Sequence, residues 1–183
     1  MTDFVLRDAR RDDVASVVAI ERASFPDPWT AGAFRRCITH AHDIFIVAER
    51  ADGTIAGYAI VRGAAGAGEL IDIAVAPGHR GRGIGGELLD TIIARAGDIG
   101  IPTLTLEVRE SNAPAIALYR SRGFDVVGAR RGYYTGPREN ALVMLRRPPS
   151  GNEPPPRAER RFGARNARSL LSPAEESNRQ EMQ

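Results

Sequence analysis

The stretch LIDIAVAPGHRGRGIGGELLD, residues 70–90, decides how the rest of the chain is interpreted. It begins with an apolar run, 70–75, that predicts a strand, and it ends in a helical pattern starting at Glu87-Leu88-Leu89. Between them lies the loop Arg80-Gly81-Arg82-Gly83-Ile84-Gly85-Gly86. Glycines at such a junction let the backbone approach a ligand, a helix N-terminus offers unpaired N–H groups to an anion, and arginines add positive charge. The stretch therefore predicts a cradle for a diphosphate.

The same glycines formally satisfy a dinucleotide-binding fingerprint, which is an alternative interpretation. Gly81, Gly83 and Gly86 fit G-x-G-x-x-G, and Glu107 follows where a ribose-binding acid would stand. However, residues 77–80 separate the strand from the glycines, whereas the fingerprint expects an immediate turn. Too little chain follows to complete a doubly wound sheet. These features disfavour the dinucleotide interpretation, and a purely structural glycine turn is the other alternative.

The composition is typical of one ordinary domain with an extension. The chain has 183 residues, of which 43% are hydrophobic, enough for a packed core. No apolar run approaches the roughly 18–20 residues that span a bilayer, and the N-terminus lacks the pattern of a signal peptide. A single cysteine, Cys37, excludes an internal disulfide and is expected to be a buried spectator. We therefore expect a cytoplasmic protein without a membrane partner.

All 25 basic residues are arginines. The absence of lysine excludes a Walker-type phosphate loop and a Schiff-base mechanism. The net charge of +2, with arginines interspersed among acids, argues against nucleic-acid binding. His40 and His42 lack metal-site partners, and His79 is expected on a loop surface, so no metal is predicted.

Strand and helix patterns fill residues 1–147 and predict one α/β domain, with a mixed, mostly antiparallel sheet flanked by helices. Asp52-Gly53 predicts a hairpin, Thr30 a helix cap, and Gly123 a helix end. Composition changes after Arg147, and the proline-rich segment 148–183 is expected to be a disordered tail. Strands are predicted at 4–7, 44–47, 55–61, 70–75, 103–108, 124–127 and 140–145, and helices after Asp12 and at 31–38, 84–96 and 113–122.

A second group of candidate residues follows the predicted strand at 103–108. Strand alternation places Thr103, Thr105 and Glu107 on one face, where Glu107 is either a solvated residue or a general base beside a cleft. Asn112 precedes Pro114 and suits the cap of the next helix. Tyr119 falls on the apolar side of that helix, so its periodicity alone predicts a core position.

The order of these motifs resembles the GNAT acyltransferase family over about residues 4–146. Arg80-Gly81-Arg82-Gly83-Ile84-Gly85 matches the acetyl-CoA signature of that family. Narrower matches, to its RimI-type branch, are Phe25-Pro26 with Pro28-Trp29, the segment 106–119, Arg130-Arg131-Gly132-Tyr133-Tyr134 and Arg138-Glu139-Asn140-Ala141. The segment Thr135-Gly136-Pro137 is shorter than the family pattern, and it lies where an acceptor peptide should enter.

The resemblance implies the GNAT fold, acetyl-CoA as acetyl donor without a metal, and a role for each matching residue. Glu107 would be the proton acceptor and Tyr119 the proton donor. Trp29, Tyr133 and Tyr134 would lie on the peptide-binding side, and for Trp29 a core aromatic is an equally weighted alternative. Residues implied to bind the donor are Ile73, Ala74, Val75, Arg80, Gly81, Arg82, Gly83, Ile84, Gly85, Gly86 and Asn112.

The implied reaction is acetyl transfer to the N-terminal α-amine, alanine in that branch, of a small-subunit ribosomal protein. Alternatives within the same enzyme class are lysine side chains, other protein N-termini or a small-molecule amine. The non-enzyme alternative is an acetyl-CoA-binding interaction module, which the presence of Glu107 and Tyr119 disfavours. The implied partner is a protein with an exposed N-terminus, and a monomer is expected.

Overall fold

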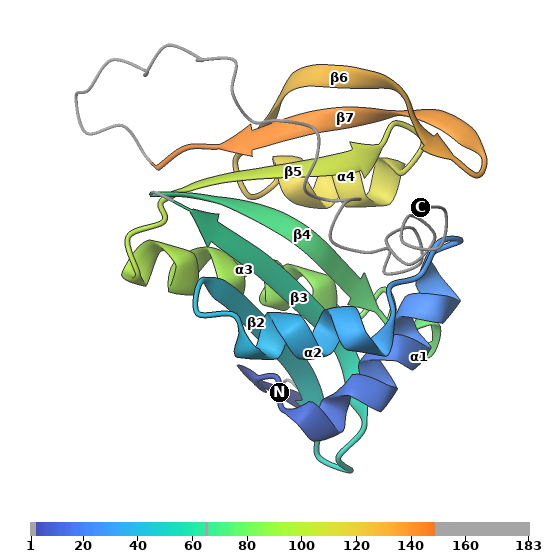
Figure 1. Cartoon of the computed structure of the whole chain (residues 1–183), viewed down its shortest axis with the longest axis vertical. Helices are drawn as coiled ribbons and strands as arrows, with labels where there is room; N and C mark the ends of the chain where they lie inside the picture. The colour runs from blue at the N-terminus through green and yellow to red at the C-terminus, as the bar shows by residue number, and fades with distance from the viewer. Residues whose placement is uncertain (1–2, 65, 149–183) are drawn as a thin grey trace, which may run out of the picture. The chain divides into compact units, whose positions relative to one another are not determined.

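The fold is built on a single β-sheet, in which one pair of neighbouring strands is parallel and the other pairs are antiparallel. The computed structural model describes residues 3–64 and 66–148. The described strands are β1 (Phe4–Asp8), β2 (Asp43–Arg50), β3 (Ile55–Ala64), β4 (Ala67–Val75), β5 (Thr103–Arg109), β6 (Phe124–Thr135) and β7 (Arg138–Arg146). They form a sheet in the order β1-β2-β3-β4-β5-β7-β6, in which only β4 and β5 run parallel (Figure 1). This is the predicted mixed, mostly antiparallel sheet.

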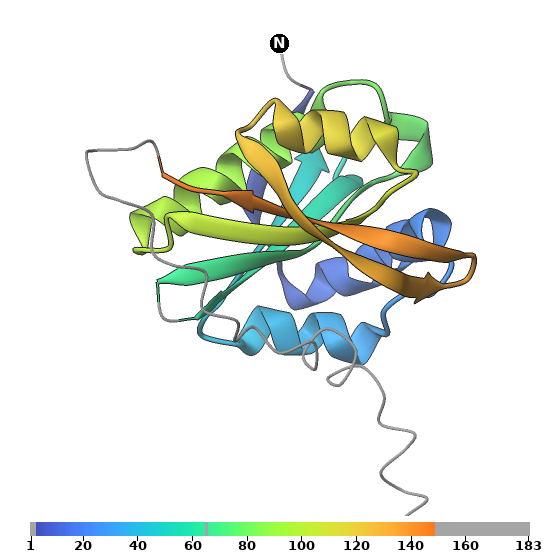
Figure 2. The same cartoon turned by 90° about the horizontal axis from the view of Figure 1, so that it is seen from above.

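Helices cover both faces of this sheet. They are α1 (Val14–Ser24), α2 (Ala31–Thr39), α3 (Ile84–Asp98) and α4 (Ala113–Arg120), with short 3-10 turns at Arg11–Asp13 and Pro77–His79. Helices α1 and α2 lie on one face, and α3 and α4 on the other (Figures 1 and 2).

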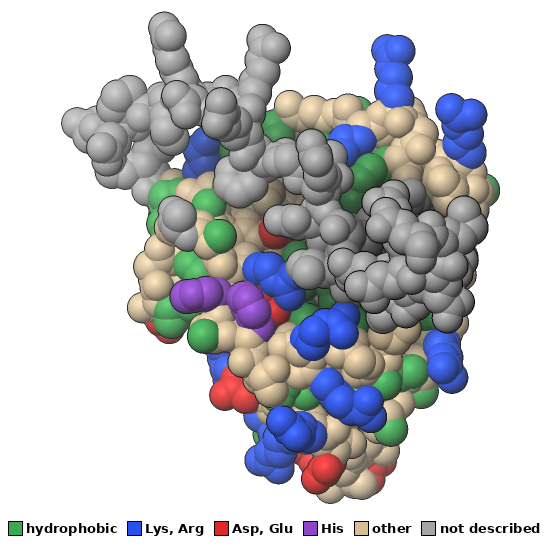
Figure 3. Space-filling model, viewed as in Figure 1, with side chains coloured by type: hydrophobic (Ala, Val, Ile, Leu, Met, Phe, Trp, Pro, Cys, Tyr) green, Lys and Arg blue, Asp and Glu red, His purple; other side chains and the backbone are tan. Residues whose placement is uncertain are grey.

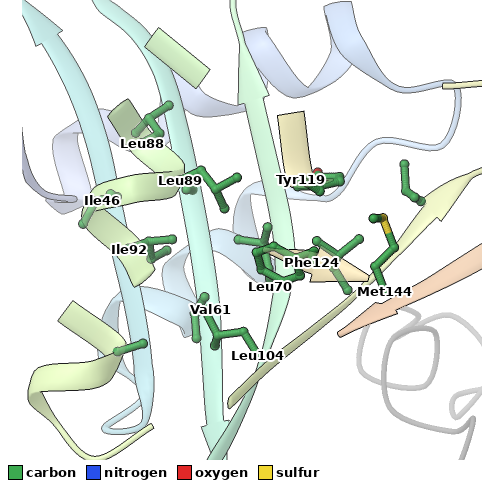
Figure 4. Packing of buried hydrophobic residues seen from close by; sticks show 14 of the residues in the cluster. Ile46, Val61, Leu70, Leu88, Leu89, Ile92, Leu104, Tyr119, Phe124 and Met144 are labelled. Atoms are coloured by element: carbon green, nitrogen blue, oxygen red, sulfur yellow. The ribbon is translucent and has the colours of Figure 1, made fainter. Parts of the chain in front are cut away.

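Each face has its own apolar core. On the α3–α4 face, Leu88 and Ile116 belong to a cluster with Phe124, part of which Figure 4 shows. On the α1–α2 face, Val17 and Phe34 belong to a second cluster. A fully buried side chain of this kind stabilises the fold by about 1.5–3 kcal/mol, so the apolar stripes of the helices fix which face each one covers.

The parallel strands separate after a short paired stretch. β4 and β5 pair only at Ala67↔Thr103, Gly68↔Leu104 and Glu69↔Thr105. Beyond this point β4 continues beside β3 alone, and β5 beside β7 alone. A bulge accompanies the separation, because Ile60 pairs with Asp72 while Val61 pairs with Leu70, which leaves Ile71 as an extra residue. Bulges increase local twist and re-aim side chains, and the sheet opens along the outer half of β4.

Local signals in the sequence predicted most of the connections. Thr30 Oγ1 accepts the Ala33 N–H at 3.3 Å, the turn with Gly53 (φ 81°) joins β2 to β3, and Gly123 (φ 80°) follows the end of α4. The residue before α1 is Asp13 and not the predicted Asp12, and its side chain does not cap that helix but accepts the Arg10 N–H across the preceding 3-10 turn at 2.7 Å.

Strands β6 and β7 are longer than the segments 124–127 and 140–145 predicted for them. Outer residues of β6 such as Val126 and Val127 are exposed on the sheet edge, so the apolar alternation that marks a half-buried strand fades along it. The disordered tail predicted for 148–183 lies outside the described residues from position 149 onward, and it stays a prediction.

Candidate functional site

The separation of β4 from β5 leaves backbone groups of both strands without a ladder partner. The register between them ends at Glu69↔Thr105, so the edge of β4 from Leu70 to Val75 that faces β5 has no strand beside it. Unpaired backbone N–H and C=O groups demand a partner. The predicted donor-binding residues Ile73, Ala74 and Val75 stand in this edge. The arrangement suits an extended ligand that lies against β4 as a strand would.

The glycine loop joins the end of β4 to α3 and leaves the helix N-terminus open. Gly83 is the N-cap residue with φ 81°, no side chain caps the helix, and Gly81 also has a left-handed φ of 74°. A Cβ placed on either residue would meet no heavy atom within 4 Å. Backbone conformation and not crowding therefore requires glycine here, and free N–H groups of the first turn can receive an anion. These features fit the diphosphate of acetyl-CoA.

The remaining glycines of the loop pack the helix against its neighbours. A Cβ on Gly85 would lie 3.6 Å from both Leu118 and Val75, which brings the start of α3, the end of β4 and α4 together. Gly86 is buried beneath the Arg122 guanidinium, 2.5 Å from the position of an added Cβ. Donor contacts by these two residues and by the buried Ile84 stay predictions.

The two arginines of the loop differ in their surroundings. The Arg80 guanidinium turns back toward β4, where Nε donates to the Val75 carbonyl at 3.0 Å and Nη2 to Ser24 Oγ at 3.0 Å. Arg82 is exposed. In this structure Arg80 thus braces the end of β4, while Arg82 lies at the surface beside the cradle. Figure 3 shows arginine side chains spread singly over the visible part of the α1–α2 face.

Glu107 lies on the α1–α2 face of β5, and strand alternation separates it from its apolar neighbours. Its neighbours Leu106 and Val108 are buried in the α3–α4 core, so Glu107 points to the opposite side. Its carboxylate is 2.5 Å from Arg130 Nε, and the side chain is 14% exposed. Burial, and next a hydrogen bond to Glu107, raises the pKa of the Tyr133 hydroxyl. Two residues of β6 therefore hold this carboxylate in place.

Tyr119 approaches the strand separation from the α3–α4 side. Its ring is 7% exposed and packs 5.9 Å from the Phe124 ring (Figure 4). Burial raises the pKa of the Tyr119 hydroxyl. The core position that periodicity predicts for Tyr119 is confirmed, and its role as a proton donor stays a prediction.

Asn112 caps α4, because its Oδ1 accepts the Ala115 N–H at 3.2 Å. This is the local role that its position before Pro114 predicts. Its side chain is exposed, and contact with the donor stays a prediction.

The three aromatic residues predicted on the peptide-binding side lie on two different elements. Trp29 lies on the α1–α2 side of the sheet, and Tyr133 and Tyr134 lie near the end of β6. Trp29 is partly buried, with its ring centroid 5.6 Å from that of Phe34. The rings of Tyr133 and Tyr134 are perpendicular, 5.1 Å apart. The structure thus gives Trp29 the packing of a core anchor, and its contact with a peptide stays a prediction.

Arg109 holds the end of the β6–β7 hairpin. Its guanidinium lies 4.1 Å from the centroid of Tyr134, pairs with Glu139 at 3.1 Å and donates to the Gly136 carbonyl at 3.1 Å. Neither this clamp nor the Arg130–Glu107 pair was predicted. Both contacts join residues that are far apart in the sequence, and no local spacing of residues predicts such contacts.

A surface hollow of about 460 Å³ lies away from these residues and has a different lining, which includes Cys37, Asp43, Arg95 and Ile99. Cys37 is 3% exposed, and burial raises its pKa to about 11, as expected of a spectator thiol.

Among the described residues no group of His, Cys, Asp or Glu side chains gathers as metal ligands. Within the same residues no helix combines the length and apolarity needed to cross a membrane.

The chain is similar to known acetyltransferases over most of its length. The model of the acetyltransferase (GNAT) family matches residues 14–124. The ribosomal protein bS18-alanine N-acetyltransferase of Escherichia coli K12 is 36% identical over 134 residues, which cover 72% of this chain and 89% of that protein. The N-alpha-acetyltransferase RimI of Mycobacterium tuberculosis is 40% identical over 126 residues, 66% of this chain and 76% of that one. The crystal structure of the ribosomal-protein-S18-alanine N-acetyltransferase from Escherichia coli superposes with a TM-score of 0.74 at 31% identity, covering 82% of this chain and 99% of the other.

Proposed function

The chain belongs to the GNAT acetyltransferase family and is an N-acetyltransferase, and from this premise we propose that its acceptor is the N-terminal α-amine of a protein. The first residue of that acceptor is alanine, and the acceptor is a small-subunit ribosomal protein, as the names of its relatives suggest. The observation that carries the proposal is the opening between β4 and β5, with Glu107 on one face of the sheet and Tyr119 on the other.

Acetyl-CoA supplies an activated thioester when it is bound, and the chain supplies the groups that hold and orient it. Backbone groups of residues 73–75 along the open edge of β4 receive the acetyl and pantetheine portion. A free N–H there can stabilise the negative oxygen that forms during attack. The loop 80–86 and the open N-terminus of α3 receive the diphosphate, and Asn112 contacts the donor near α4.

Glu107 accepts the proton that the acceptor amine must lose. An α-amine has a pKa of about 7.7–8.0, so a large part of it carries a proton at neutral pH. As nitrogen attacks the acetyl carbon, the N–C bond forms and the proton passes to Glu107, directly or through one water. Arg130 and Tyr133 orient the carboxylate for this step. A lysine side chain, with a pKa near 10.4, is harder to deprotonate at the same site.

Tyr119 donates a proton to the sulfur atom of the C–S bond that breaks. The C–S bond cleaves, and the hydroxyl of Tyr119 protonates the departing thiolate, so charge does not accumulate on coenzyme A. The raised pKa of the buried Tyr119 keeps its hydroxyl protonated through the neutral pH range. Because the proton donor and the proton acceptor lie on opposite faces of the sheet, we expect the amine to enter and the thiol to leave from opposite sides.

A thiol-release assay with a panel of acceptors tests this proposal. The panel holds peptides that begin with Ala, Ser, Met or Gly, and lysine peptides blocked at the N-terminus, and mass spectrometry locates the acetyl group. We expect the alanine peptide to be preferred and modified at its α-amine. Modification of lysine side chains alone would replace the proposed acceptor with the lysine alternative. Acetyl-CoA binding without thiol release from any acceptor would favour the interaction module.

A further inference from the structure

A buried cluster of two carboxyl groups and one tyrosine lies between α1, β3 and β4. It takes no part in the chemistry proposed above. It consists of Glu21 on α1, Tyr58 on β3 and Asp72 in the bulge of β4, which are 2%, 0% and 9% exposed. The Tyr58 hydroxyl is hydrogen-bonded to Glu21 Oε2 and, at 2.9 Å, to Asp72 Oδ2. Carboxyl groups are almost never fully buried unless they are paired, so the cluster needs a physical explanation.

The hydrogen bonds of this cluster require one more proton than the Tyr58 hydroxyl supplies. That hydroxyl has a single hydrogen but contacts two carboxyl groups. One carboxyl group is therefore a neutral acid, and the two carboxyl groups also lie within hydrogen-bonding reach of each other. Burial raises the pKa of both carboxyl groups, and it holds that of Asp72 well above its usual range. The Tyr58 hydroxyl and the Trp29 N–H favour the ionised form of Glu21. The cluster thus holds a neutral Asp72 and an anionic Glu21.

The cluster connects a backbone segment to the open strand. Glu21 Oε1 accepts the backbone N–H of Trp29 at 2.9 Å. At its other end Asp72 directly precedes Ile73, where the unpaired edge of β4 runs toward the glycine loop. Trp29 lies between α1 and α2, outside any regular element. Three side chains therefore link the backbone of Trp29, within the segment 25–30, to β4.

We propose that Glu21, Tyr58 and Asp72 form a positioning unit, which fixes the segment 25–30 against β4 and thereby sets the affinity for the acceptor. The inference rests on the proposed function, in which β4 carries the thioester, and on the family resemblance, which implies that Trp29 lies on the peptide-binding side. A cluster that served stability alone would change folding when altered, but it would not discriminate between the two substrates.

Three variants separate positioning from stability. Glu21→Met fills the same space without an acceptor for the Trp29 N–H, whereas Glu21→Gln keeps an oxygen for that N–H and gains a donor for the Tyr58 oxygen. Asp43→Asn is the matched control, because the Asp43 carboxylate is also buried and pairs with Arg62 at 2.6 Å, beyond the end of α2 that is opposite to Trp29.

Glu21→Met should raise the KM for the acceptor peptide roughly tenfold to a hundredfold, the factor that corresponds to a lost hydrogen bond to a charged group. The Kd for acetyl-CoA and kcat should change by less than about threefold, since the donor groups are untouched. Glu21→Gln should restore the acceptor KM to within about threefold of the wild type. Asp43→Asn should lower thermal stability and leave the acceptor KM unchanged.

A readout that needs no activity keeps this inference distinct from the proposed function. Trp29 is the single tryptophan of the chain, so its emission reports on this segment alone. Glu21→Met should shift the emission to the red and speed amide hydrogen exchange in residues 25–30, whereas Glu21→Gln and Asp43→Asn should not. If the wild type acetylates no peptide of the panel, the proposed function fails while the exchange data still test the linkage.

Unchanged exchange in 25–30 together with an unchanged acceptor KM in Glu21→Met overturns the inference. An equal rise of the acceptor KM in Asp43→Asn overturns it as well, because general loosening would then suffice. Should Glu21→Met not fold, Tyr58→Phe carries the test. It removes the bridging hydroxyl, keeps the ring, and should raise the acceptor KM at least about threefold with acetyl-CoA binding intact; equal KM values would again reject the positioning role.

Discussion

Gly83 offers a test that separates a ligand-binding cradle from a merely structural turn. It is the N-cap of α3 with φ 81°, and an added Cβ meets no heavy atom within 4 Å. Gly53, in the turn between β2 and β3, has the same φ of 81° and the same open surroundings. Alanine substitutions at the two positions are therefore matched. Each should destabilise the fold by about 1–2 kcal/mol, the cost of a left-handed conformation for an L-residue, and lower Tm by roughly 2–8 °C.

Only Gly83→Ala should weaken the binding of acetyl-CoA. Its methyl group would occupy open space beside the first N–H groups of α3, where the diphosphate is proposed to bind. Loss of one hydrogen bond to a charged group corresponds to about 1.5–3 kcal/mol, and hence to a rise in Kd of roughly 10- to 150-fold. Calorimetric titration of both variants with acetyl-CoA measures this difference. If Gly83→Ala and Gly53→Ala bind acetyl-CoA equally well, the cradle is assigned wrongly, however much stability both variants lose.

Three further predictions concern the proton-transfer residues and a buried ion pair. Glu107→Gln keeps the size of the side chain but cannot accept a proton, so kcat should fall by roughly 10²–10⁴; a wild-type rate in single-turnover experiments would reject Glu107 as the base. Tyr119→Phe keeps the ring packing and should slow the chemical step by roughly 10²–10⁴ with acetyl-CoA affinity intact, and unchanged turnover would make Tyr119 a packing residue. The hydrogen-bonded Arg7 guanidinium lowers the pKa of Asp13, so this pair stabilises the fold above the unfolded pKa of about 4, and the stabilisation is lost as pH falls through the lower folded pKa. Asp13→Asn should lose about 1–3 kcal/mol at neutral pH and lose less on acidification than the wild type; parallel stability curves from urea melts at pH 7 and below pH 4 would contradict the pairing.

The elements of the fold were predictable where local chemistry marks them. Thr30 and Gly123 mark helix ends because a hydroxyl can cap the first turn and glycine accepts a left-handed φ. The alternation around Glu107 correctly separated it from the buried residues Leu106 and Val108. The lengths of β6 and β7 were not predictable, since an edge strand with exposed residues such as Val126 lacks the periodic burial that marks a strand.

The surroundings of the candidate site were less accessible to sequence reasoning. Arg130 meets Glu107 from β6, two strands away from β5, and Asp72 meets Glu21 through Tyr58 on a third element. The spacing of these residues in the sequence does not predict such contacts, because the contacts arise from the order of strands in the sheet. Arg80 illustrates the same limit: the loop motif predicts its proximity to a phosphate, whereas the structure directs its guanidinium to the Val75 carbonyl and Ser24.

By itself the sequence determined the family of the chain, the glycine loop before α3 and the alternation that separates Glu107 from its apolar neighbours. These properties depend on residues close together in the chain, where φ preferences, helix caps and the two-residue period of a strand act directly. Only the tertiary structure decided that β4 and β5 separate after Glu69, and that Tyr119 and Glu107 approach that opening from opposite faces. A parallel contact between strands joined by a helix, a bulge at Ile71 and a buried cluster drawn from α1, β3 and β4 are long-range outcomes of packing, and local propensity does not encode them.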